Sequence, residues 1–328
     1  MRIVLCYPAL PHHIAQIQEA APDCEIVDAG QERIDELLPT ADIFIGHAKV
    51  PVDWDRALKQ RRLRWIQSSA AGLDHCLVPG VIESEIVVCS ASGLFAPQVA
   101  EQTMTLLFDL LRSQGRFWRA ADRHEFIRLP TDDLRRKRIG IVGLGGNGRQ
   151  IAKVLKPFDV TIEATDYFQF DPPPEVDRLL PAEQIDVMLA DVDIVILALP
   201  LNATTRGMFN ADRFAKMKPG SYFVNVARGQ VVVEADLIAA LDSGHLRGAG
   251  VDVTEVEPLP DDSPLWDREN VIITPHVGAQ SHWRVDDTTT LICENLRRYF
   301  SGQPLFNRVD KELGFPTPDV VWKAAGDC

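Results

Sequence analysis

Short apolar runs of strand length alternate with helical patterns along the whole chain, and this alternation constrains the fold more than any other feature. In the first third, helical stretches such as residues 14–20 and 54–60 separate the runs. The strands predicted there are Ile3–Tyr7, Glu25–Ala29, Ile43–His47, Trp65–Ser68 and Ile86–Ser90. Alternating strands and helices predict a parallel sheet with helices on its faces. Because 328 residues exceed one ordinary core, we expect two such domains.

A second and more apolar series begins at Arg138. Its predicted strands are Ile139–Gly143, Val160–Thr165, Ile194–Leu199, Tyr222–Ala227, Ala249–Val253 and Val271–Thr274. Continuous apolar strands are typical of a sheet covered on both faces, and six strands complete a dinucleotide-binding fold. The longer helices are predicted at Ala96–Leu111, Asn147–Leu155 and Gln280–Phe300. The fold class is therefore α/β, with two doubly wound parallel sheets.

Composition excludes several classes of protein. The net charge of −13 argues against a nucleic-acid partner, which a basic face would mark. No run approaches the ~18 apolar residues that a membrane span needs. The six cysteines are scattered and mostly lie in apolar runs, so we expect reduced thiols and a cytoplasmic location.

The segment Gly-Leu-Gly-Gly-Asn-Gly at 143–148 follows a predicted strand and opens a predicted helix. In this context Gly143 permits a tight turn, Gly145 lets the backbone approach a pyrophosphate, and Gly148 allows close helix–strand packing. The predicted cofactor contacts from this loop are Gly143, Gly145, Gly146, Asn147 and Gly148. A nucleoside-triphosphate loop is disfavoured because Arg and Gln replace its final Lys and Ser or Thr.

Asp166 ends the next predicted strand. An acid there can accept hydrogen bonds from the ribose hydroxyls and repel a 2′-phosphate. No Lys or Arg occurs from Val160 to Asp177, so NAD is favoured over NADP. The alternative interpretation is that Asp166 only opens a turn.

Arg228, Glu257 and His276 follow three later strands of the second series. Ligands of doubly wound sheets bind beyond the carboxyl ends of the strands, so these side chains are expected on the edge that carries the glycine loop. Singly, each has an ordinary explanation as an ion pair, a loop acid or a buried histidine. Together they suit reduction of a 2-oxo acid. His276 would supply the proton, Glu257 would orient its ring, and Arg228 would bind the substrate carboxylate.

Other catalytic patterns are incomplete, and no metal site is predicted. The segment His124–Arg128 begins like a zinc-protease helix but lacks the second histidine. His12 and His13 have no acid or thiol ligand pattern nearby in the sequence. No Gly-x-Ser-x-Gly nucleophile motif occurs.

The chain resembles the D-isomer-specific 2-hydroxyacid dehydrogenases over nearly its whole length. The matching segments are 71–74 (Ala-Gly-Leu-Asp), 99–101 (Val-Ala-Glu), 143–148, 225–229 (Asn-Val-Ala-Arg-Gly), 250–253 (Gly-Val-Asp-Val), 257–260 (Glu-Pro-Leu-Pro), 263–266 (Ser-Pro-Leu-Trp) and 270–276. Asn147 departs from the aliphatic residue that the family commonly has. The chain lacks the glutamine that related formate dehydrogenases carry opposite the histidine and the lysine that phosphite dehydrogenases carry in the loop of Ala71. We also expect no C-terminal regulatory domain of the kind found in longer phosphoglycerate dehydrogenases.

This resemblance implies a Rossmann domain, residues 99–284, inserted in a flavodoxin-like substrate domain made of residues 1–98 and 285–328. It implies that Arg228, Glu257 and His276 are catalytic and that backbone amides of Ala71 and Gly72 hold the substrate carboxylate. It also implies a homodimer. Asp252 would hold the nicotinamide carboxamide. Further cofactor contacts are assigned to Pro200, Ala227 and Gly278.

The function predicted is NAD(H)-dependent interconversion of a small 2-oxo acid, such as glyoxylate or hydroxypyruvate, and its D-2-hydroxy acid. A dinucleotide-sensing, corepressor-like binding protein of the same fold is the alternative. An adenosylmethionine-dependent methyltransferase would leave the three catalytic candidates without a role. The substrate pocket stays open, with His47, Lys49, Leu73, Gln280 and Trp283 as candidates to shape it.

Overall fold

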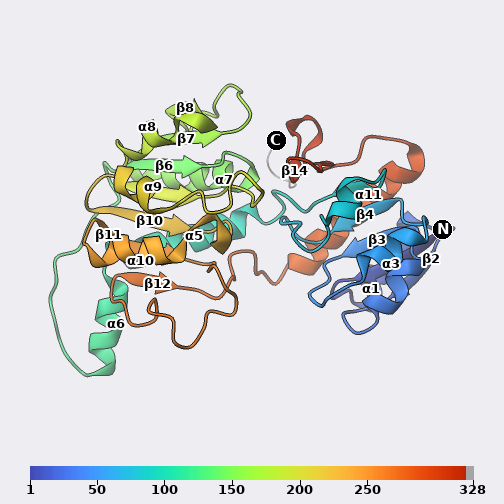
Figure 1. The fold of residues 1–328 in the computed structure, drawn as a ribbon, viewed down its shortest axis with the longest axis horizontal. Helices are drawn as coiled ribbons and strands as arrows, with labels where there is room; N and C mark the ends of the chain where they lie inside the picture. The colour runs from blue at the N-terminus through green and yellow to red at the C-terminus, as the bar shows by residue number, and fades with distance from the viewer. Residues whose placement is uncertain (323–328) are drawn as a thin grey trace. The chain divides into compact units, whose positions relative to one another are not determined.

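The computed structural model describes residues 1–322 and divides the chain into two compact units. The first unit comprises Met1–Phe95 and Ser281–Cys328, and the second comprises Ala96–Gln280. Each unit is built on a parallel sheet, of five strands in the first and seven in the second. This confirms the predicted class of two doubly wound α/β domains (Figure 1).

The first unit has the strand order β2-β1-β3-β4-β5, which is the flavodoxin-like order. Its strands are β1 Arg2–Cys6, β2 Glu25–Asp28, β3 Ile43–Gly46, β4 Trp65–Ser68 and β5 Val87–Cys89. Its helices are α1 Pro11–Ala20, α2 Ile34–Leu37, α3 Trp54–Lys59, α4 Pro79–Ile82 and α11 Arg284–Ser301, with short 3₁₀ turns at Leu38–Thr40 and Pro318–Val320. A two-stranded ribbon, β13 Val309–Asp310 with β14 Phe315–Pro316, completes the unit.

Alternate side chains along the strands of the first unit pack into two apolar clusters, one on each face of its sheet. Ile3 and Leu5 of β1 pack in the cluster that contains Ile17 of α1 and Ile292 of α11. Val4, between them, joins the opposite cluster with residues of α2 and α3. Successive side chains of a strand point to opposite faces, so a continuous apolar run serves two cores. The helix predicted at Gln280–Phe300 begins later than expected, at Arg284, because residues 280–281 are irregular and residues 282–283 form a turn.

The second unit has the strand order β12-β11-β10-β9-β6-β7-β8, and all neighbours are parallel. Its strands are β6 Arg138–Val142, β7 Thr161–Asp166, β8 Arg178–Pro181, β9 Ile194–Leu197, β10 Ser221–Asn225, β11 Leu246–Val251 and β12 Val271–Ile273. Its helices are α5 Ala96–Leu111, α6 Gln114–Asp122, α7 Gly146–Leu155, α8 Ile185–Leu189, α9 Ala211–Lys216 and α10 Glu234–Asp242, with 3₁₀ turns at Lys156–Phe158, Ala182–Gln184 and Gly229–Val231. Counted from β6 this is the dinucleotide-binding order with one further strand.

The prediction of six strands in this unit was wrong, because β8 was missed. Its four residues, Arg-Leu-Leu-Pro, contain only two apolar side chains and lie at the edge of the sheet beside β7. An edge strand is paired on one side only and has little core to cover, so its sequence carries a weak apolar signal.

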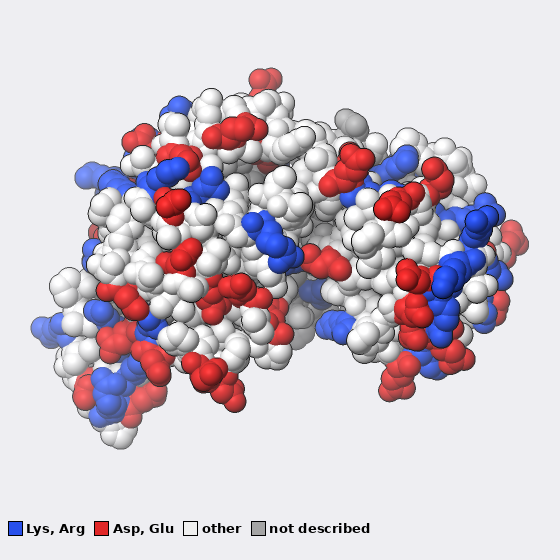
Figure 2. Space-filling model, in the orientation of Figure 1, with Lys and Arg blue, Asp and Glu red and all other residues white. Residues whose placement is uncertain are grey.

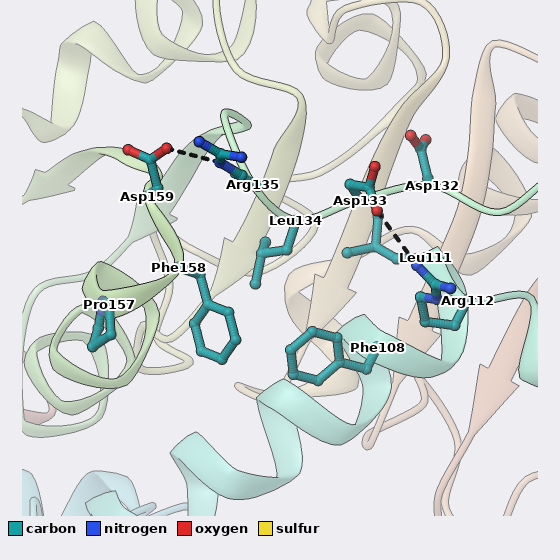
Figure 3. Close-up of a pocket in the computed structure, with 10 residues that line it drawn as sticks. All are labelled: Phe108, Leu111, Arg112, Asp132, Asp133, Leu134, Arg135, Pro157, Phe158 and Asp159. Carbon is teal, nitrogen blue, oxygen red and sulfur yellow. Dashed lines mark hydrogen bonds and ion pairs between the residues drawn. The ribbon is translucent and has the colours of Figure 1, made fainter.

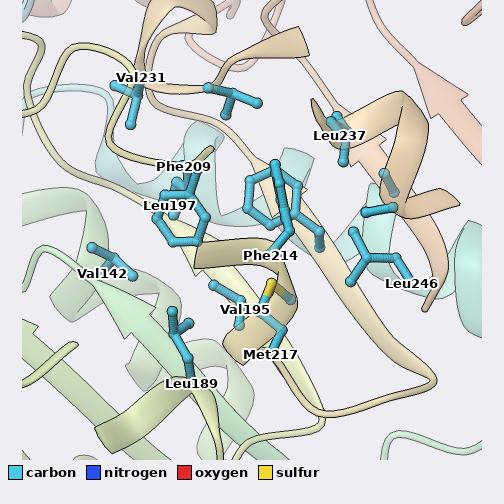
Figure 4. Packing of buried hydrophobic residues seen from close by; sticks show 14 of the residues in the cluster. Val142, Leu189, Val195, Leu197, Phe209, Phe214, Met217, Val231, Leu237 and Leu246 are labelled. Carbon is cyan, nitrogen blue, oxygen red and sulfur yellow. The ribbon is translucent and has the colours of Figure 1, made fainter. Parts of the chain in front are cut away.

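Two cores enclose the second sheet. Val195 and Leu197 of β9 pack with Phe223 and with Phe214 of α9 in one cluster (Figure 4). Ile194 and Ile196 join the other cluster with residues of α5 and α7. Fully burying a side chain of this size contributes roughly 1.5–3 kcal/mol. The sheet is therefore a rigid platform from which loops project at the carboxyl ends of its strands.

Each sheet has one point where the strand order reverses direction. In the first unit it lies between β1 and β3, and in the second between β6 and β9. Ligands of open α/β sheets bind at such points. A ligand is consequently expected at the loops after β1 and β3 in the first unit and after β6 and β9 in the second.

Acidic and basic side chains are interspersed on the face shown in Figure 2. The five cysteines at 6, 24, 76, 89 and 293 are free and buried, whereas Cys328 lies outside the described residues. Within residues 1–322, no helix combines the length and hydrophobicity that crossing a bilayer requires.

Candidate active site

The glycine loop of the second unit links β6 to α7 at the point of strand reversal. Gly143 has φ +95°, and a Cβ there would meet the Ala198 carbonyl oxygen after β9 at 2.8 Å. A Cβ on Gly148 would overlap the carbonyl oxygen of Gly143. These two glycines therefore allow the loop to lie against β9 and the helix to dock on the loop, as the sequence predicted.

Gly145 differs because a Cβ there would enter open space with nothing within 4 Å. It is the N-cap residue of α7, and no side chain caps the helix. Gly146 and Asn147 are the first two residues of the helix. Unpaired N–H groups at a helix N-terminus favour an anion. The open space at Gly145 fits a dinucleotide pyrophosphate, which a side chain would obstruct.

Asp166 ends β7 beside this loop. Its carboxylate accepts from the Leu144 N–H at 2.6 Å and from the Phe168 N–H at 2.9 Å. A carboxylate has about four acceptor positions, so capacity remains for ribose hydroxyls.

A cation that the sequence search missed also lies near Asp166. The Arg149 guanidinium, from α7, packs over the Phe170 ring at 4.2 Å and interacts electrostatically with Asp166. Burial lowers the pKa of Arg149, and the charge of Asp166 opposes that shift. The sequence prediction rested on the absence of Lys and Arg from Val160 to Asp177, whereas this cation comes from the preceding helix α7.

His276 and Glu257 form the central pair of the candidate site. His276 Nδ1 lies 2.8 Å from Glu257 Oε2, and Glu257 Oε1 accepts from the Thr254 N–H at 3.2 Å. Burial acts to raise the pKa of Glu257, but the hydrogen bond and charge of His276, with smaller contributions from Thr254 and Arg228, hold it below its usual value. The His276 and Glu257 side chains are 45% and 38% exposed, so a small molecule can reach them.

The backbone of His276 is held by Asp252 at the end of β11. His276 has φ +53°, and its N–H donates to the Asp252 carbonyl at 2.7 Å. The buried Asp252 carboxylate accepts from Thr274 Oγ1 at 2.6 Å and from the N–H groups of Val277 and Gly278 at 3.0 and 2.8 Å. Because the carboxylate anchors three points of the turn, it fixes where the imidazole lies.

Thr274 is a positioning residue that sequence reasoning missed. Its hydroxyl accepts from Gln102 Nε2 at 2.8 Å and donates to Asp252 at 2.6 Å. This chain of hydrogen bonds ties the histidine turn to α5. The sequence offered one signal for this role, a β-branched polar residue between an apolar run and a proline. Such residues are common in turns, so the signal is weak.

Arg228 follows β10 in a tight turn. The buried Asn225 side chain accepts from the Ala227 N–H at 3.0 Å and donates to the Arg228 carbonyl at 3.1 Å. A Cβ on Gly229 would overlap the Thr254 carbonyl oxygen. Only glycine permits this approach, which brings the turn beside the segment that bears Glu257. Arg228 is close enough to contribute to the lowered pKa of Glu257.

The second unit thus brings together Arg228, Glu257 and His276, with Ala227 beside Arg228 and Gly278 beside Asp252. Pro200 follows β9, and its carbonyl accepts from Thr205 Oγ1 at 2.8 Å. One pocket of this unit lies elsewhere, between Phe108, Leu134 and Phe158, with the ion pairs Arg112–Asp133 and Arg135–Asp159 at its rim (Figure 3). None of the predicted site residues lines that pocket.

The sequence of residues 104–278, more than half of the chain, matches the NAD-binding domain of D-isomer-specific 2-hydroxyacid dehydrogenases. The chain belongs to this family. It is an oxidoreductase of the 2-hydroxyacid dehydrogenase type, with a nicotinamide-dinucleotide-binding domain.

Individual dehydrogenases of the family match most of the chain. The human glyoxylate reductase/hydroxypyruvate reductase is 30% identical over 87% of this chain and 90% of its own length. The NADPH-dependent glyoxylate/hydroxypyruvate reductase of Sinorhizobium meliloti, solved with NADP and sulfate, has a TM-score of 0.82 at 29% identity, covering 96% and 99% of the two chains. The NAD-dependent formate dehydrogenase of Staphylococcus aureus, solved with NAD, has a TM-score of 0.77 at 26% identity, covering 95% and 98%.

The first unit of this dehydrogenase carries the segment that the family resemblance assigns to substrate. Ser68 Oγ accepts from the Ala70 N–H at 3.0 Å, and the Ala70 carbonyl accepts from the Ala91 N–H at 3.0 Å. Within residues 1–322, the next two amides, of Ala71 and Gly72, donate no hydrogen bond. The loop is therefore anchored at Ala70 and presents two N–H groups that can hold an anion.

His12 and His13 have no acid or thiol ligand pattern near them in the sequence, but α11 brings Asp286 to them in space. His13 Nε2 lies 2.7 Å from Asp286 Oδ1, and His12 Nε2 lies 3.6 Å from it. These three groups could hold a metal ion by distance alone. However, His13 Nδ1 accepts from the Leu10 N–H at 3.0 Å, which leaves the proton on the nitrogen facing Asp286. This arrangement suits a helix-to-helix hydrogen bond.

Proposed function

We propose that this dehydrogenase uses NAD(H) to interconvert a small 2-oxo acid and its D-2-hydroxy acid, with His276 as general acid and base. The observation that carries the proposal is the 2.8 Å pair between His276 Nδ1 and Glu257 Oε2, in the same unit as the glycine loop. Glyoxylate and hydroxypyruvate are the substrates we propose, because related enzymes named for them share about 30% identity over most of the chain.

When bound, NADH would supply the hydride that reduction of the carbonyl carbon requires. Glu257 accepts a hydrogen bond from His276 Nδ1, so Nε2 is the nitrogen that delivers the proton to the carbonyl oxygen. Arg228 binds the carboxylate and polarises the carbonyl with its planar fork. The N–H groups of Ala71 and Gly72 are the substrate contacts that the family resemblance implies for the first unit. In oxidation, neutral His276 takes the hydroxyl proton back.

NAD is proposed as the cofactor in preference to NADP because Asp166 ends β7 beside the glycine loop, and an acid at this position repels a 2′-phosphate. Gly143 to Gly148 would hold the pyrophosphate, with Pro200, Ala227 and Gly278 as further contacts. Asp252 would accept from the carboxamide with its remaining lone pair. Residues 99–284 would form the cofactor domain, and residues 1–98 with 285–328 the substrate domain.

The decisive variant is His276→Ala. General acid catalysis contributes about 10²–10⁴-fold, so kcat for glyoxylate should fall by that factor. NADH binding, followed by fluorescence, should change little because His276 is not among the proposed cofactor contacts. Turnover close to that of the unaltered protein would remove His276 from the mechanism. NADH binding without turnover of any oxo acid by the unaltered protein would favour the dinucleotide-sensing alternative.

We also propose a cytoplasmic homodimer. Five free, buried cysteines fit a reducing compartment. The support for a dimer is an arm comprising residues 112–135. Its helix α6 begins against the β12 edge of the sheet, where Arg116 pairs with Glu269, and its far end extends away from the sheet (Figure 1). Trp118, Phe126 and Ile127 of this arm are 54%, 91% and 37% exposed. Clustered exposed apolar side chains commonly mark an association surface.

A further inference from the structure

Two imidazole rings stack in the first unit beside the candidate substrate loop. The His47 and His75 centroids are 4.0 Å apart, with 24° between the planes. His47 is the first residue after β3, and its N–H donates to the Cys6 carbonyl of β1 at 2.9 Å. It therefore lies at the strand-reversal point of this sheet, where ligands of such folds bind. Both rings are partly buried.

The loop that carries His47 is held on both sides. Gln31 Nε2 donates to the His47 carbonyl at 2.9 Å, and Gln31 Oε1 accepts from the Lys49 N–H at 2.7 Å. Before it, Gly46 has φ +141°, and a Cβ there would overlap the Cys6 carbonyl. Only a glycine at position 46 allows β3 to end so close to β1. His47 is thus presented by a constrained segment.

His75 is linked to the substrate loop through Ser68. His75 Nε2 lies 3.5 Å from Ser68 Oγ, and the same hydroxyl binds both the N–H and the carbonyl of Ala70 at 3.0 and 3.1 Å. His75 also follows Gly72 by three residues in the chain. The stacked pair is consequently next to the two N–H groups that can hold a carboxylate.

The geometry points to a second role for the two loops that carry His47 and His75: their imidazole rings bind an oxygen substituent on carbon 3 of the substrate. The enzyme therefore prefers 3-hydroxy-2-oxo acids to their 3-deoxy analogues. This inference rests on the proposed function. With the carboxylate on Ala71 and Gly72, carbon 3 is two bonds away, within the span between that loop and the adjacent rings. An imidazole donates or accepts a hydrogen bond at each nitrogen, which suits a hydroxyl and offers nothing to a methyl group.

Hydroxypyruvate and pyruvate test this subsite because they differ by one oxygen. The variants His47→Phe and His75→Phe keep an aromatic ring to stack but remove the ring nitrogens. Each should lower the kcat/KM ratio of hydroxypyruvate to pyruvate by about tenfold, the value of one hydrogen bond. The fall in this ratio should come mainly from a lower kcat/KM for hydroxypyruvate. An unchanged ratio, or equal losses with both substrates, would overturn the subsite.

Glyoxylate separates failure of the subsite from failure of the proposed function, because it has no carbon 3. Its kcat/KM should be nearly unaffected in both variants. If the unaltered protein reduces glyoxylate but the ratio does not respond, only the subsite is wrong. If it reduces none of the three oxo acids, the proposed function and the subsite both fall. His245→Phe, which alters a ring bonded to the Met217 carbonyl in the other unit, is the matched control and should leave the ratio unchanged.

Gln31 acts in this account as a positioning residue. Gln31→Ala should lower the same ratio by a smaller factor while leaving glyoxylate kinetics and the melting temperature nearly unchanged. Gln31→Glu keeps the acceptor for Lys49 and should restore part of the preference. Uniformly raised KM values for all three substrates would show that Gln31 has a structural role only. They would contradict the inference that Gln31 positions His47 to bind the oxygen on carbon 3.

Discussion

At the scale of single residues, the candidate site depends on charges whose environments differ sharply. Glu257 is ionised beside His276 and near Arg228, and these partners outweigh the burial that would raise its pKa. A depressed pKa contributes stability above the ordinary carboxyl range, and that contribution is lost as pH falls through the lowered value. At neutral pH the carboxylate is therefore charged and can accept the hydrogen bond from His276.

Glu257→Gln should shift the pH profiles of both directions of the reaction to lower pH. Glutamine keeps a hydrogen-bond partner but removes the charge that stabilises protonated His276. Reduction should therefore fail at a lower pH than in the unaltered protein, and oxidation should begin at a lower pH. The measurement is kcat/KM against pH, with a deuterated cofactor to verify that hydride transfer limits the rate. Unshifted profiles would show that Glu257 does not control the protonation of His276.

Asp166→Asn should narrow the preference for NADH over NADPH. The change removes the charge that opposes a 2′-phosphate and leaves Arg149 nearby to attract one. We expect the ratio of kcat/KM values for the two cofactors to change by roughly tenfold, equivalent to about 1.4 kcal/mol. The double variant Asp166→Asn, Arg149→Ala should lose most of the gain with NADPH. Equal use of both cofactors by the unaltered protein would contradict this role of Asp166.

At the scale of elements, the glycine loop shows how three similar residues serve different purposes. Gly143 and Gly148 are required by close backbone contacts that are already present in the protein, whereas Gly145 borders open space at the start of α7. The first two therefore have a structural role, and the third is free to serve a ligand. Spacing in the sequence does not separate these roles, because it does not reveal what each absent Cβ would meet.

Gly145→Ala and Gly148→Ala should separate folding from cofactor binding. Gly148→Ala forces a Cβ against the Gly143 carbonyl and should cost about 1–3 kcal/mol of stability through overpacking. Gly145→Ala should change the free energy of unfolding by less than about 0.5 kcal/mol but should weaken NADH binding by at least about tenfold. Melting temperature and NADH titration distinguish the two. Full NADH affinity in Gly145→Ala would argue against a pyrophosphate in that space.

At the scale of the whole molecule, the arm at 112–135 carries exposed apolar side chains, with Phe126 at 91% and Trp118 at 54%. The pocket of Figure 3 lies at its base, lined by Arg112 and by residues 132–135 from the two ends of the arm. A two-fold interface joins one surface to its own copy. The proposed dimer would pair the apolar arm of one protomer with the partly apolar hollow of its partner.

Light scattering should give a mass about twice the 36.5 kDa of one chain. Replacing Trp118 and Phe126 together with aspartate should shift this mass toward that of a monomer, because charges would be buried in the interface. Phe300→Asp, which alters an exposed aromatic side chain of α11 in the first unit, is the control and should not change the mass. A monomeric unaltered protein would rule out the proposed dimer.

The sequence by itself determined the class of fold and nearly all of the central strands. Strand-length apolar runs such as Ile194–Leu197 need two covered faces, and that requirement is local and periodic. It also placed Arg228, Glu257 and His276 after three strands, because the carboxyl ends of parallel strands share one edge. The edge strand β8 escaped this reasoning, since an element with one neighbour needs little apolar surface.

Only the tertiary structure decided which side chains meet. Arg149 approaches Asp166 from a different element, and Asp286 reaches His13 across more than 270 residues of chain. Asp252, Thr274 and Asn225 hold the turns that bear His276 and Arg228 through hydrogen bonds whose partners no periodicity predicts. The His47–His75 stack likewise joins the ends of neighbouring strands. Such contacts depend on how loops pack after the sheet has formed, and a polar loop residue has the same appearance in sequence whether it faces solvent or a ligand.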